Sequence, residues 1–257
     1  MDKTLLKGLS VLEALILPGK NRAAPTIQHL AERLGMTKSN MHRTLQTLAH
    51  AGYAQRDDSS GSYSVTTKLV ELAARQLDNI DLRRIAADTL KKLAAETTET
   101  VHLSILEGSE VVYIDKIDSA HPVRAYSTIG GRAPAQCVAT GKALLAFQTV
   151  DPVARLSGKL EAFTSKSIID AGALATELAR IRKNGYAINR GEWRETVGGL
   201  AAPLFDGFSR VVGAIGISGP IERLSVGRMK ELAPVVLKAA SRVSRVMGYV
   251  PGRVSAC

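Results

Sequence analysis

Cysteine is scarce in this chain of 257 residues, which has one near its middle and one at its last position. Two cysteines cannot build the disulfide framework of a small secreted domain, and the absence of CxxC and HExxH spacings argues against a structural metal site. Runs of the roughly 18 apolar residues that span a membrane are also missing. The apolar N-terminal segment contains Lys7 and Glu13 and lacks a small-residue cleavage site. We therefore expect a cytoplasmic protein without a membrane partner, metal or cofactor.

Motifs of the common enzyme classes are missing as well. The sequence contains neither GxSxG nor GxGxxG, and its five histidines are scattered. The segment ATGKA, residues 139–143, resembles a phosphate-binding loop. However, the motif GxxxxGK[ST] needs glycine where Gln136 stands and serine or threonine where Ala143 stands. We assign no catalytic residue and expect that the protein is not an enzyme.

The charge balance is strongly basic, with a net charge of +10 and an isoelectric point near 9.7. Such a balance fits a polyanionic partner, although the first 80 residues carry only +3 of it and the remainder +7. Locally the pattern is clearer, because Lys38, Arg43 and Arg56 share a stretch that contains no acidic residue. This stretch is the best candidate for a contact with nucleic acid.

Residues 37–48, TKSNMHRTLQTL, have the pattern of a short amphipathic helix. Met41, Leu45 and Leu48 fall on one stripe, Thr37 is a good N-cap and Gly52 is a good C-terminal stop. A polar outer face without carboxylates suits the DNA major groove, where base edges and phosphates offer mainly acceptors. Taken alone, this pattern is more typical of an ordinary amphipathic surface helix, so the neighbouring segments must decide. The outward side chains are Ser39, Asn40, Arg43, Gln46 and Thr47.

The neighbouring segments place this helix in a larger unit. A helix over residues 4–17 has Leu5, Leu9, Leu12 and Ile16 spaced for one inward face, and a second helix begins after the cap Thr26 and ends at Gly35. Only two residues separate the second helix from the third, which predicts a helix-turn-helix. Residues 53–56 and 62–65 then form a hairpin. We predict a winged helix-turn-helix domain over residues 1–66, the alternative being a generic small α+β subdomain.

An apolar helix should follow as a linker over residues 67–80. It is too apolar to stay exposed, so it packs either on a partner chain or on the second domain of its own chain. Its apolar residues are Leu69, Val70, Leu72, Ala73 and Leu77.

The remaining residues, 81–257, alternate between strand and helix patterns. Asp81 can cap a helix that ends near residue 95, and Pro234 should kink or divide the last helix. Gly213 and Gly216 lie inside an apolar strand, where glycine indicates close packing. We predict an α+β protein whose C-terminal domain has a mixed, mainly antiparallel sheet flanked by helices. The predicted strands are 101–106, 111–118, 122–127, 186–189, 199–205 and 210–218, and the helices are 134–147, 170–184 and 221–249.

The second domain also contains a candidate site for a small polar ligand. A helix that begins near Pro134 presents free N–H groups, and Gly130 and Gly131 let a ligand approach the backbone. The segment NRGEW, residues 189–193, combines an amide, a guanidinium, a carboxylate and the only tryptophan. The alternatives are a surface turn with a partly buried tryptophan and, for Cys137, a buried small residue.

In combination, these motifs resemble the IclR-type transcriptional regulators. The likeness covers about residues 5–250 and lies in GMTKSNMHRTLQTLAHAGY, TTKLVELA, GRAPAQCVATGKALLA, NRGEWRETVGGLAAPL and VVGAIGISGP. It implies a winged-helix DNA-binding domain, a linker helix used in dimerisation and a GAF-like effector-binding domain. It further implies dimers or dimers of dimers that bind palindromic operators, often near genes for catabolism of the effector.

The family patterns assign residues to both sites. The pattern KS..HR falls on Lys38, Ser39, His42 and Arg43. Many members have an acidic run at residues 189–192, where this chain has NRGE. The amide and the cation that replace the first carboxylates are expected to favour a carboxylate effector. Gly198 and Gly199 stand where many members have a bulkier residue or cysteine, which is expected to enlarge the pocket. The predicted DNA contacts are Thr37, Lys38, Ser39, Asn40, His42, Arg43, Gln46, Thr47, Ser60 and Tyr63. The predicted effector contacts are Tyr126, Gly130, Gly131, Arg132, Ala133, Cys137, Asn189, Glu192, Trp193, Gly199, Leu200 and Ser218.

The leading hypothesis is a ligand-responsive transcriptional regulator, more specifically a repressor of catabolic genes. Its expected partners are double-stranded DNA with a palindromic operator, a small carboxylate and further copies of the same chain. The competing hypothesis is a winged-helix domain fused to an enzymatic or nucleotide-binding domain. A winged-helix protein that binds only other macromolecules is a third.

Overall fold

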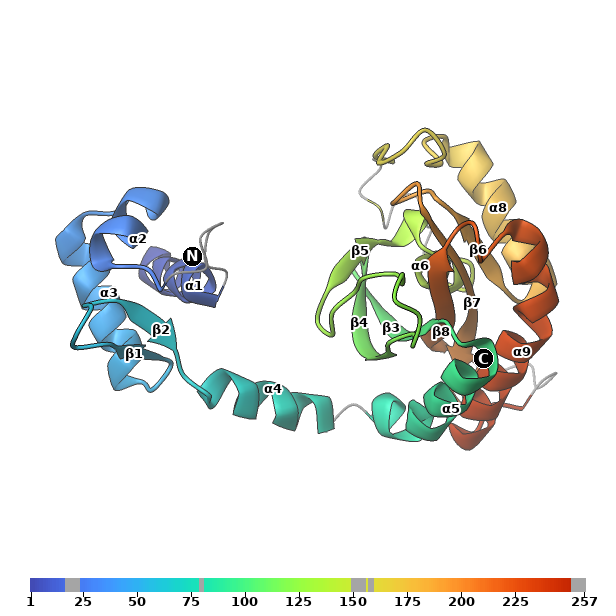
Figure 1. Ribbon diagram of the computed structural model, residues 1–257, viewed down its shortest axis with the longest axis horizontal. Coiled ribbons are helices and arrows are strands. Elements are labelled where there is room, and N and C mark those ends of the chain that lie inside the picture. Colours follow the sequence, from blue (N-terminus) through green and yellow to red (C-terminus); the bar gives the residue numbers. More distant parts are fainter. Residues whose placement is uncertain (17–23, 79–80, 149–155, 157–159, 251–257) are drawn as a thin grey trace. The chain divides into compact units, whose positions relative to one another are not determined.

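The chain forms two compact units, Met1–Asn79 and Ile80–Cys257. The computed structural model describes residues 1–16, 24–78, 81–148, 156 and 160–250 (Figure 1). Within these ranges, no helix combines the length and apolar character needed to cross a bilayer. The same ranges contain no group of three or more His, Cys, Asp or Glu side chains placed to hold a metal ion. The α+β class is confirmed, with a helix-turn-helix unit followed by an α/β unit.

The first unit contains the predicted helix-turn-helix and hairpin (Figure 1). The side chain of Thr26 accepts a hydrogen bond from the N–H of His29, and that of Thr37 accepts one from Asn40, so both predicted N-caps are confirmed. Gly35 ends the second helix with φ 61°, in the left-handed region that glycine favours. The elements are α1 (Lys3–Ile16), α2 (Ile27–Leu34), α3 (Lys38–His50), β1 (Ala54–Arg56), β2 (Tyr63–Val65) and α4 (Lys68–Asp78).

The predicted inward face of α1 was wrong. The helix buries Val11, Ala14 and Leu15 against α2 and α3, whereas Leu5 and Leu9 are 62% and 47% exposed. Because α1 is leucine-rich, it carries two apolar stripes, and periodicity alone does not decide which one meets the rest of its own domain. The first unit therefore has an exposed apolar surface on α1, and in α4 Val70 is also 68% exposed.

The second unit is built on a six-stranded sheet with the strand order β5-β4-β3-β8-β7-β6. All five pairings are antiparallel, so the mixed component of the predicted sheet is not found among the described strands. The prediction of a strand at 122–127 was wrong, because the edge of the sheet is β5, which pairs with β4. The strands are β3 (Thr100–Glu107), β4 (Glu110–Ile117), β5 (Arg132–Pro134), β6 (Ala187–Arg190), β7 (Val197–Phe205) and β8 (Val211–Pro220).

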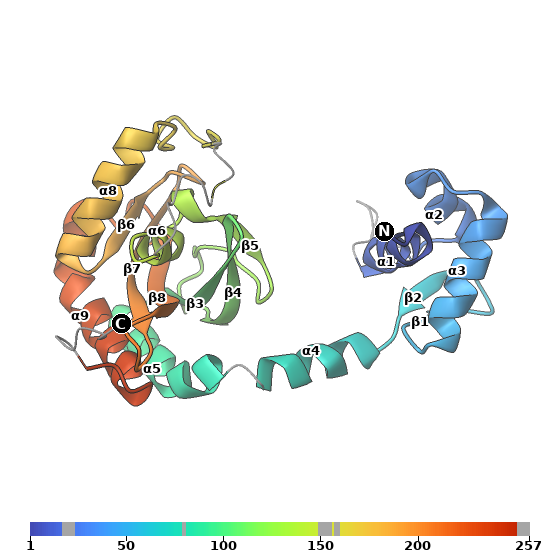
Figure 2. The ribbon, with the colours of Figure 1, turned by 180° about the vertical axis from the view of Figure 1, so that it is seen from behind.

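Helices cover both faces of this sheet (Figures 1 and 2). The helices α5 (Asp81–Thr97) and α9 (Val226–Val246) pack on one face, and α6 (Ala139–Leu145) and α8 (Ala171–Asn184) pack on the other. Successive side chains of a strand point to opposite faces. Along β7, Leu200 accordingly faces α5 and α9, whereas Ala201 faces α6 and α8.

Glycines in β8 allow close contact with helix α5 and with the neighbouring strand β7. A Cβ at Gly213 would lie 2.5 Å from the Leu82 side chain, and one at Gly216 would lie 2.6 Å from Ala201. The close packing predicted for both glycines is therefore confirmed. The last helix, α9, continues through Pro234 without division.

The predicted helix over 134–147 begins later than expected. Pro134 ends strand β5, residues Ala135–Cys137 form a single 3₁₀ turn, η1, and α6 starts only at Ala139. A Cβ at Gly141 would lie 2.2 Å from the carbonyl oxygen of Ala135. Glycine at this position lets α6 fold back against η1.

Candidate functional site

The outer face of α3 presents a polar surface free of carboxylates. Met41 and Leu45 are buried, as predicted, and they fix the orientation of the helix in the first unit. Every side chain that the sequence assigned to a DNA contact on this helix is exposed, although Thr37 is also used as the N-cap. These side chains are Thr37, Lys38, Ser39, Asn40, His42, Arg43, Gln46 and Thr47.

The two DNA contacts predicted in the hairpin of β1 and β2 differ in their exposure to solvent. Ser60 is exposed in the turn between β1 and β2. The carboxylate of Asp57 organises this turn by accepting hydrogen bonds from Ser59 and Ser60, and these bonds lower its pKa. Tyr63 is only 3% exposed and belongs to the hydrophobic core. Its assignment as a DNA contact is corrected, because β2 turns this side chain inward.

A cavity of about 50 Å³ lies in the second unit, on the face of the sheet covered by α6. At about 10–15 Å³ per water, this volume holds a few water-sized groups, which suits a small metabolite. Strands from both halves of the sheet contribute to it, together with α6 and the connection between β6 and β7. The lining residues are His102, Tyr113, Ala125, Tyr126, Ser127, Val138, Ala139, Thr140, Asn189, Trp193, Arg194, Val197, Gly199, Ile217 and Ser218.

A buried histidine connects two hydroxyl groups of the cavity wall. The Nε2 atom of His102 lies 2.6 Å from Ser218 Oγ, and Nδ1 lies 3.4 Å from Ser127 Oγ. Burial, assisted by the charge of Lys116, lowers the pKa of His102 to about 4. The imidazole is therefore neutral near pH 7, with one ring nitrogen donating and the other accepting. His102 also packs against Tyr113, with ring centroids 4.9 Å apart.

The NRGEW segment forms a tight loop that borders the cavity. Asn189 Oδ1 accepts hydrogen bonds from the N–H groups of Gly191 and Glu192, each at 3.0 Å. Gly191 has φ 87°, and a Cβ there would lie 2.7 Å from a backbone oxygen of Glu195. The side chain of Ser167 holds the loop from outside by donating to the Glu192 carbonyl at 2.6 Å. Asn189 thus shapes the loop and also lines the cavity.

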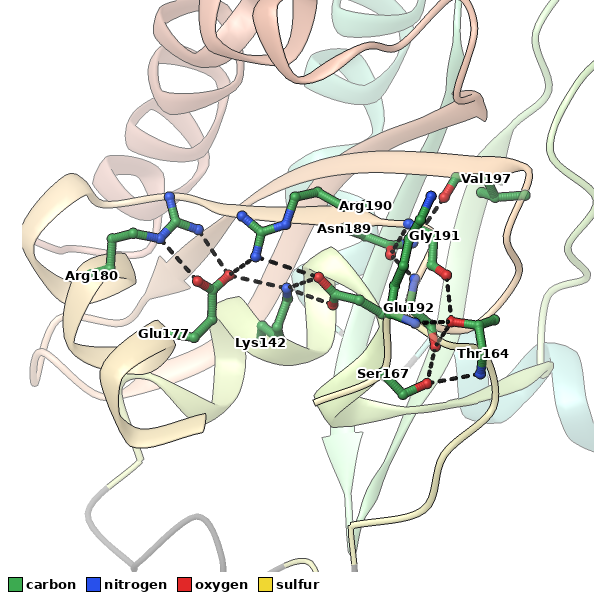
Figure 3. Close-up of polar contacts among 11 residues, drawn as sticks. Lys142, Thr164, Ser167, Glu177, Arg180, Asn189, Arg190, Gly191, Glu192 and Val197 are labelled. Carbon is green, nitrogen blue, oxygen red and sulfur yellow. Dashed lines mark hydrogen bonds and ion pairs between the residues drawn. The ribbon is translucent and has the colours of Figure 1, made fainter. Parts of the chain in front are cut away.

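A buried ionic cluster lies at the other end of this loop (Figure 3). Lys142, whose side chain is fully buried in α6, places Nζ 2.6 and 2.8 Å from the two carboxylate oxygens of Glu192 and 3.1 Å from Glu177. Arg180 and Arg190 contact Glu177 from outside. Burial raises the pKa of Glu177, but the hydrogen bonds from Arg180 and the charge of Lys142 outweigh it and lower the value to about 2. For Glu192, burial dominates and raises the pKa.

Comparison with known proteins decides the family. The model of the IclR helix-turn-helix domain matches residues 4–58, and the model described as "Bacterial transcriptional regulator IclR C-terminal" matches residues 74–245. The chain belongs to the IclR family. It is a ligand-responsive transcriptional regulator that binds DNA.

Relatives within the IclR family align along most of the chain. The regulator KdgR of Escherichia coli is 38% identical over 248 residues, which cover 96% of this chain and 93% of KdgR. The transcriptional repressor IclR of the same organism is 30% identical and covers 96% of this chain and 90% of its own length. The crystal structure of Thermotoga maritima IclR is 29% identical, with a TM-score of 0.79 over 96% of this chain and 99% of that one.

Five of the twelve effector contacts predicted from the IclR resemblance line the cavity, and seven do not. Gly130 and Gly131 form a turn beside Tyr113 that leads into strand β5 and not into a helix. Arg132 is exposed and paired with Glu107 and Glu110. The five on the lining are Tyr126, Asn189, Trp193, Gly199 and Ser218, and the remaining four off it are Ala133, Cys137, Glu192 and Leu200.

These four residues are buried in parts of the second unit that do not line the cavity. Leu200 faces α5 and α9, because it directly follows Gly199 in the strand and side chains alternate. Glu192 pairs with Lys142. Ala133 and Cys137 are in the interior, where burial raises the pKa of the Cys137 thiol to about 11 and leaves it protonated.

The cavity also contains residues that sequence reasoning missed in this IclR-family chain. In the sequence, His102 is one of five scattered histidines, and no pattern assigns Tyr113 or Thr140 to a ligand site. His102 and Ser218 are 116 positions apart, and only the pairing of β3 with β8 brings them together. A usable signal was the period of two, which places His102, Ser104 and other polar side chains on one face of an otherwise apolar strand.

Proposed function

We propose that this protein is a homodimeric repressor of catabolic genes and that a small carboxylate in the α6 cavity controls its affinity for a palindromic operator. The observation that carries the proposal is the combination of a cavity with a polar inner wall in one unit and an exposed, carboxylate-free α3 in the other. By linkage, the effector changes DNA affinity by the same factor as DNA changes effector affinity. Operator-binding titrations with and without the acid test this directly.

A non-enzymatic role fits the chemistry of the cavity. Ser218 and His102 are in contact, as a nucleophile and its base would be. In hydrolases a carboxylate usually orients the base from its other nitrogen. Here Nδ1 of His102 instead faces the hydroxyl of Ser127. The relatives compared above are regulators, and turnover of small esters or acids by the purified protein would contradict this assignment.

The homodimer is proposed from the apolar surface of the first unit. A groove of about 640 Å³ lies between α1 and α3, and it is lined by Leu5, Leu9, Leu12, Leu48 and Tyr53 among other residues. Exposed leucines on one contiguous surface indicate a protein partner, and α4 has exposed apolar side chains of its own, Val70 and Leu72. A second copy of the chain supplies a matching surface, as a two-fold interface requires.

Arg43→Ala should weaken operator binding by about 1–3 kcal/mol, because arginine makes the commonest specific contact to guanine in the major groove. Arg43 is exposed on α3 and has no acidic neighbour on this helix. The measurement is a fluorescence-anisotropy titration of an operator that the wild-type protein selects from random duplexes. If Arg43 contacts a phosphate, the salt slope also falls by about one.

The matched control for this variant is Arg242→Ala, which removes the same charge from an exposed position of α9. It should leave operator affinity unchanged. Effector affinity should be unchanged in both variants. Equal operator affinity of Arg43→Ala and wild type at moderate salt would remove Arg43 from the DNA interface.

Gly199→Val should reduce effector affinity at least about tenfold, since three added carbon atoms would occupy a cavity of about 50 Å³. A Cβ at Gly199 would lie 3.6 Å from both Ala139 and Asn189, which line the cavity. Thermal-shift measurements with an acid that stabilises the wild type provide the readout. Operator binding without ligand is the internal control and should persist. Undiminished binding of the acid would place the effector elsewhere.

A further inference from the structure

Arg194 differs in charge from the other side chains described on the cavity lining. Of the side chains that line it in the described part of the chain, Arg194 is the only one that is ionised at neutral pH. His102 is neutral because burial lowers its pKa to about 4, and burial raises the pKa of Tyr113 to about 12 against the opposing charge of Arg194. The positive charge of Arg194 thus opposes the rise in the pKa of Tyr113, which lies on the same cavity lining.

Two cations close to the NRGEW loop, Lys142 and Arg190, are already paired with carboxylates. Lys142 lies between Glu177 and Glu192, and Arg190 lies 3.5 Å from the first and 3.7 Å from the second (Figure 3). Among the residues with described positions, no carboxylate lies within 4.0 Å of Arg194. Its positive charge is therefore available for a ligand.

A neighbouring aromatic ring positions Arg194 at the cavity rim. Its guanidinium carbon lies 4.6 Å from the centroid of the Trp193 ring, which is cation–π geometry. Trp193 is itself half-buried on the cavity lining, whereas Arg194 is exposed. An exposed guanidinium stays solvated until a ligand arrives, so its charge costs little in the free protein.

We propose that Arg194 is the specificity residue that binds the anionic group of the effector at the rim of the cavity. The inner wall, with the buried Thr140 and neutral His102 and the half-buried Ser218 beside them, then receives a hydroxyl or carbonyl oxygen of the same molecule. This inference rests on the proposed function, because it takes the cavity as the effector site. It identifies the ligand class as short acids with a second polar group, oriented with the carboxylate outward.

The reverse orientation is disfavoured by the chemistry of the inner wall. A carboxylate placed against Ser218 and His102 would lose its hydration and gain only neutral hydrogen-bond partners. At the rim, the same carboxylate keeps part of its hydration and gains a planar guanidinium that can donate two parallel hydrogen bonds. The location of Arg194 at the rim therefore sets the direction of the ligand.

Matched pairs of compounds test this inference by calorimetric titration of the full-length protein. Lactate is compared with propane-1,2-diol, and glycerate with glycerol, because each pair differs only in the carboxylate. Wild type should bind each acid more tightly than its alcohol. Arg194→Gln should lose about tenfold or more in affinity for the acids and change its affinity for the alcohols less than twofold. Arg194→Lys should be intermediate, since it keeps the charge and loses the planar geometry.

Arg228→Gln is the control, because it removes an exposed arginine on α9 that pairs with Glu231 and is not on the cavity lining. It should bind the acids as wild type does. The inference is overturned if wild type does not prefer the acids, if none of the four compounds binds, or if Arg194→Gln weakens acids and alcohols equally. If acid binding depends on Arg194 while operator affinity ignores the acid, the inference stands and the proposed function fails.

Discussion

Lys142→Met is expected to lower the free energy of unfolding of the second unit by about 3–5 kcal/mol, the usual cost of removing one partner from a buried ion pair. The Lys142 side chain is fully buried, and those of Glu177 and Glu192 are 8% and 2% exposed. Methionine fills a similar volume, so the loss comes from two carboxylates left without their shared cation. Glu177 keeps Arg180, whereas Glu192 keeps only a distant contact with Arg190. Denaturant unfolding of the full chain, monitored by Trp193 fluorescence, measures the effect.

The pH dependence of this loss of stability distinguishes two possible causes, the unpaired carboxylate of Glu192 and a change in packing around residue 142. Without Lys142, the folded-state pKa of Glu192 lies further above its ordinary value of 4.5, so the folded protein takes up a proton. Stability then falls as the pH rises through that interval, and the variant should lose less at about pH 5 than at about pH 8. Lys183→Met, at an exposed position of α8, is the matched control and should change little. A loss independent of pH would assign the effect to packing.

Gly141→Ala should destabilise the second unit by about 3 kcal/mol, although alanine is the better helix former by about 1 kcal/mol. The new Cβ would lie 2.2 Å from the oxygen and 2.4 Å from the Cα of Ala135, and both are backbone atoms that no side-chain rotation can move. Either η1 or α6 must shift. Since α6 supplies Thr140 to the cavity, ligand binding should be lost as well.

Gly227→Ala is the control for this helix glycine. Its added Cβ would meet only Ser225 Oγ at 3.9 Å in the first turn of α9, so the variant should be as stable as wild type or slightly more stable. Thermal unfolding of both variants, with and without a bound acid, gives the comparison. If Gly141→Ala is as stable as the wild type, η1 can move away from the new Cβ without a loss of stability.

Features of the fold that depend on local chemistry were predictable from the sequence. Thr26 and Thr37 cap helices because their hydroxyls reach the N–H groups three residues on, and Gly185 ends α8 with a left-handed φ of 77°. The inward face of α8 was predictable as well, since Leu174, Leu178 and Ile181 are spaced to fall on one side of the helix, and all three are buried. In α1 both sides contain leucine, so the choice between them depended on contacts that the sequence does not encode locally.

The candidate site was predictable only in part, for a similar reason. Asn189 and Trp193 were found because they lie close together in an unusual loop. His102 and Ser218 come from strands that are distant in sequence, and the register of β3 against β8 joins them. Gly199 and Leu200 differ by a single position, yet the pleat sends one to the cavity and the other to the opposite layer. Motif matching cannot resolve that distinction without the sheet.

The alternation along β7 and β8 divides the second unit between two independent tasks. Gly199 and Ser218 line the cavity on one face, while Leu200 and Ile215 pack against α5 and α9 on the other. A substitution on the cavity face can change what is sensed without touching the layer that contributes most to the core. Such a sheet lets one scaffold diverge toward new metabolites by single mutations, with its folding stability largely insulated from the change.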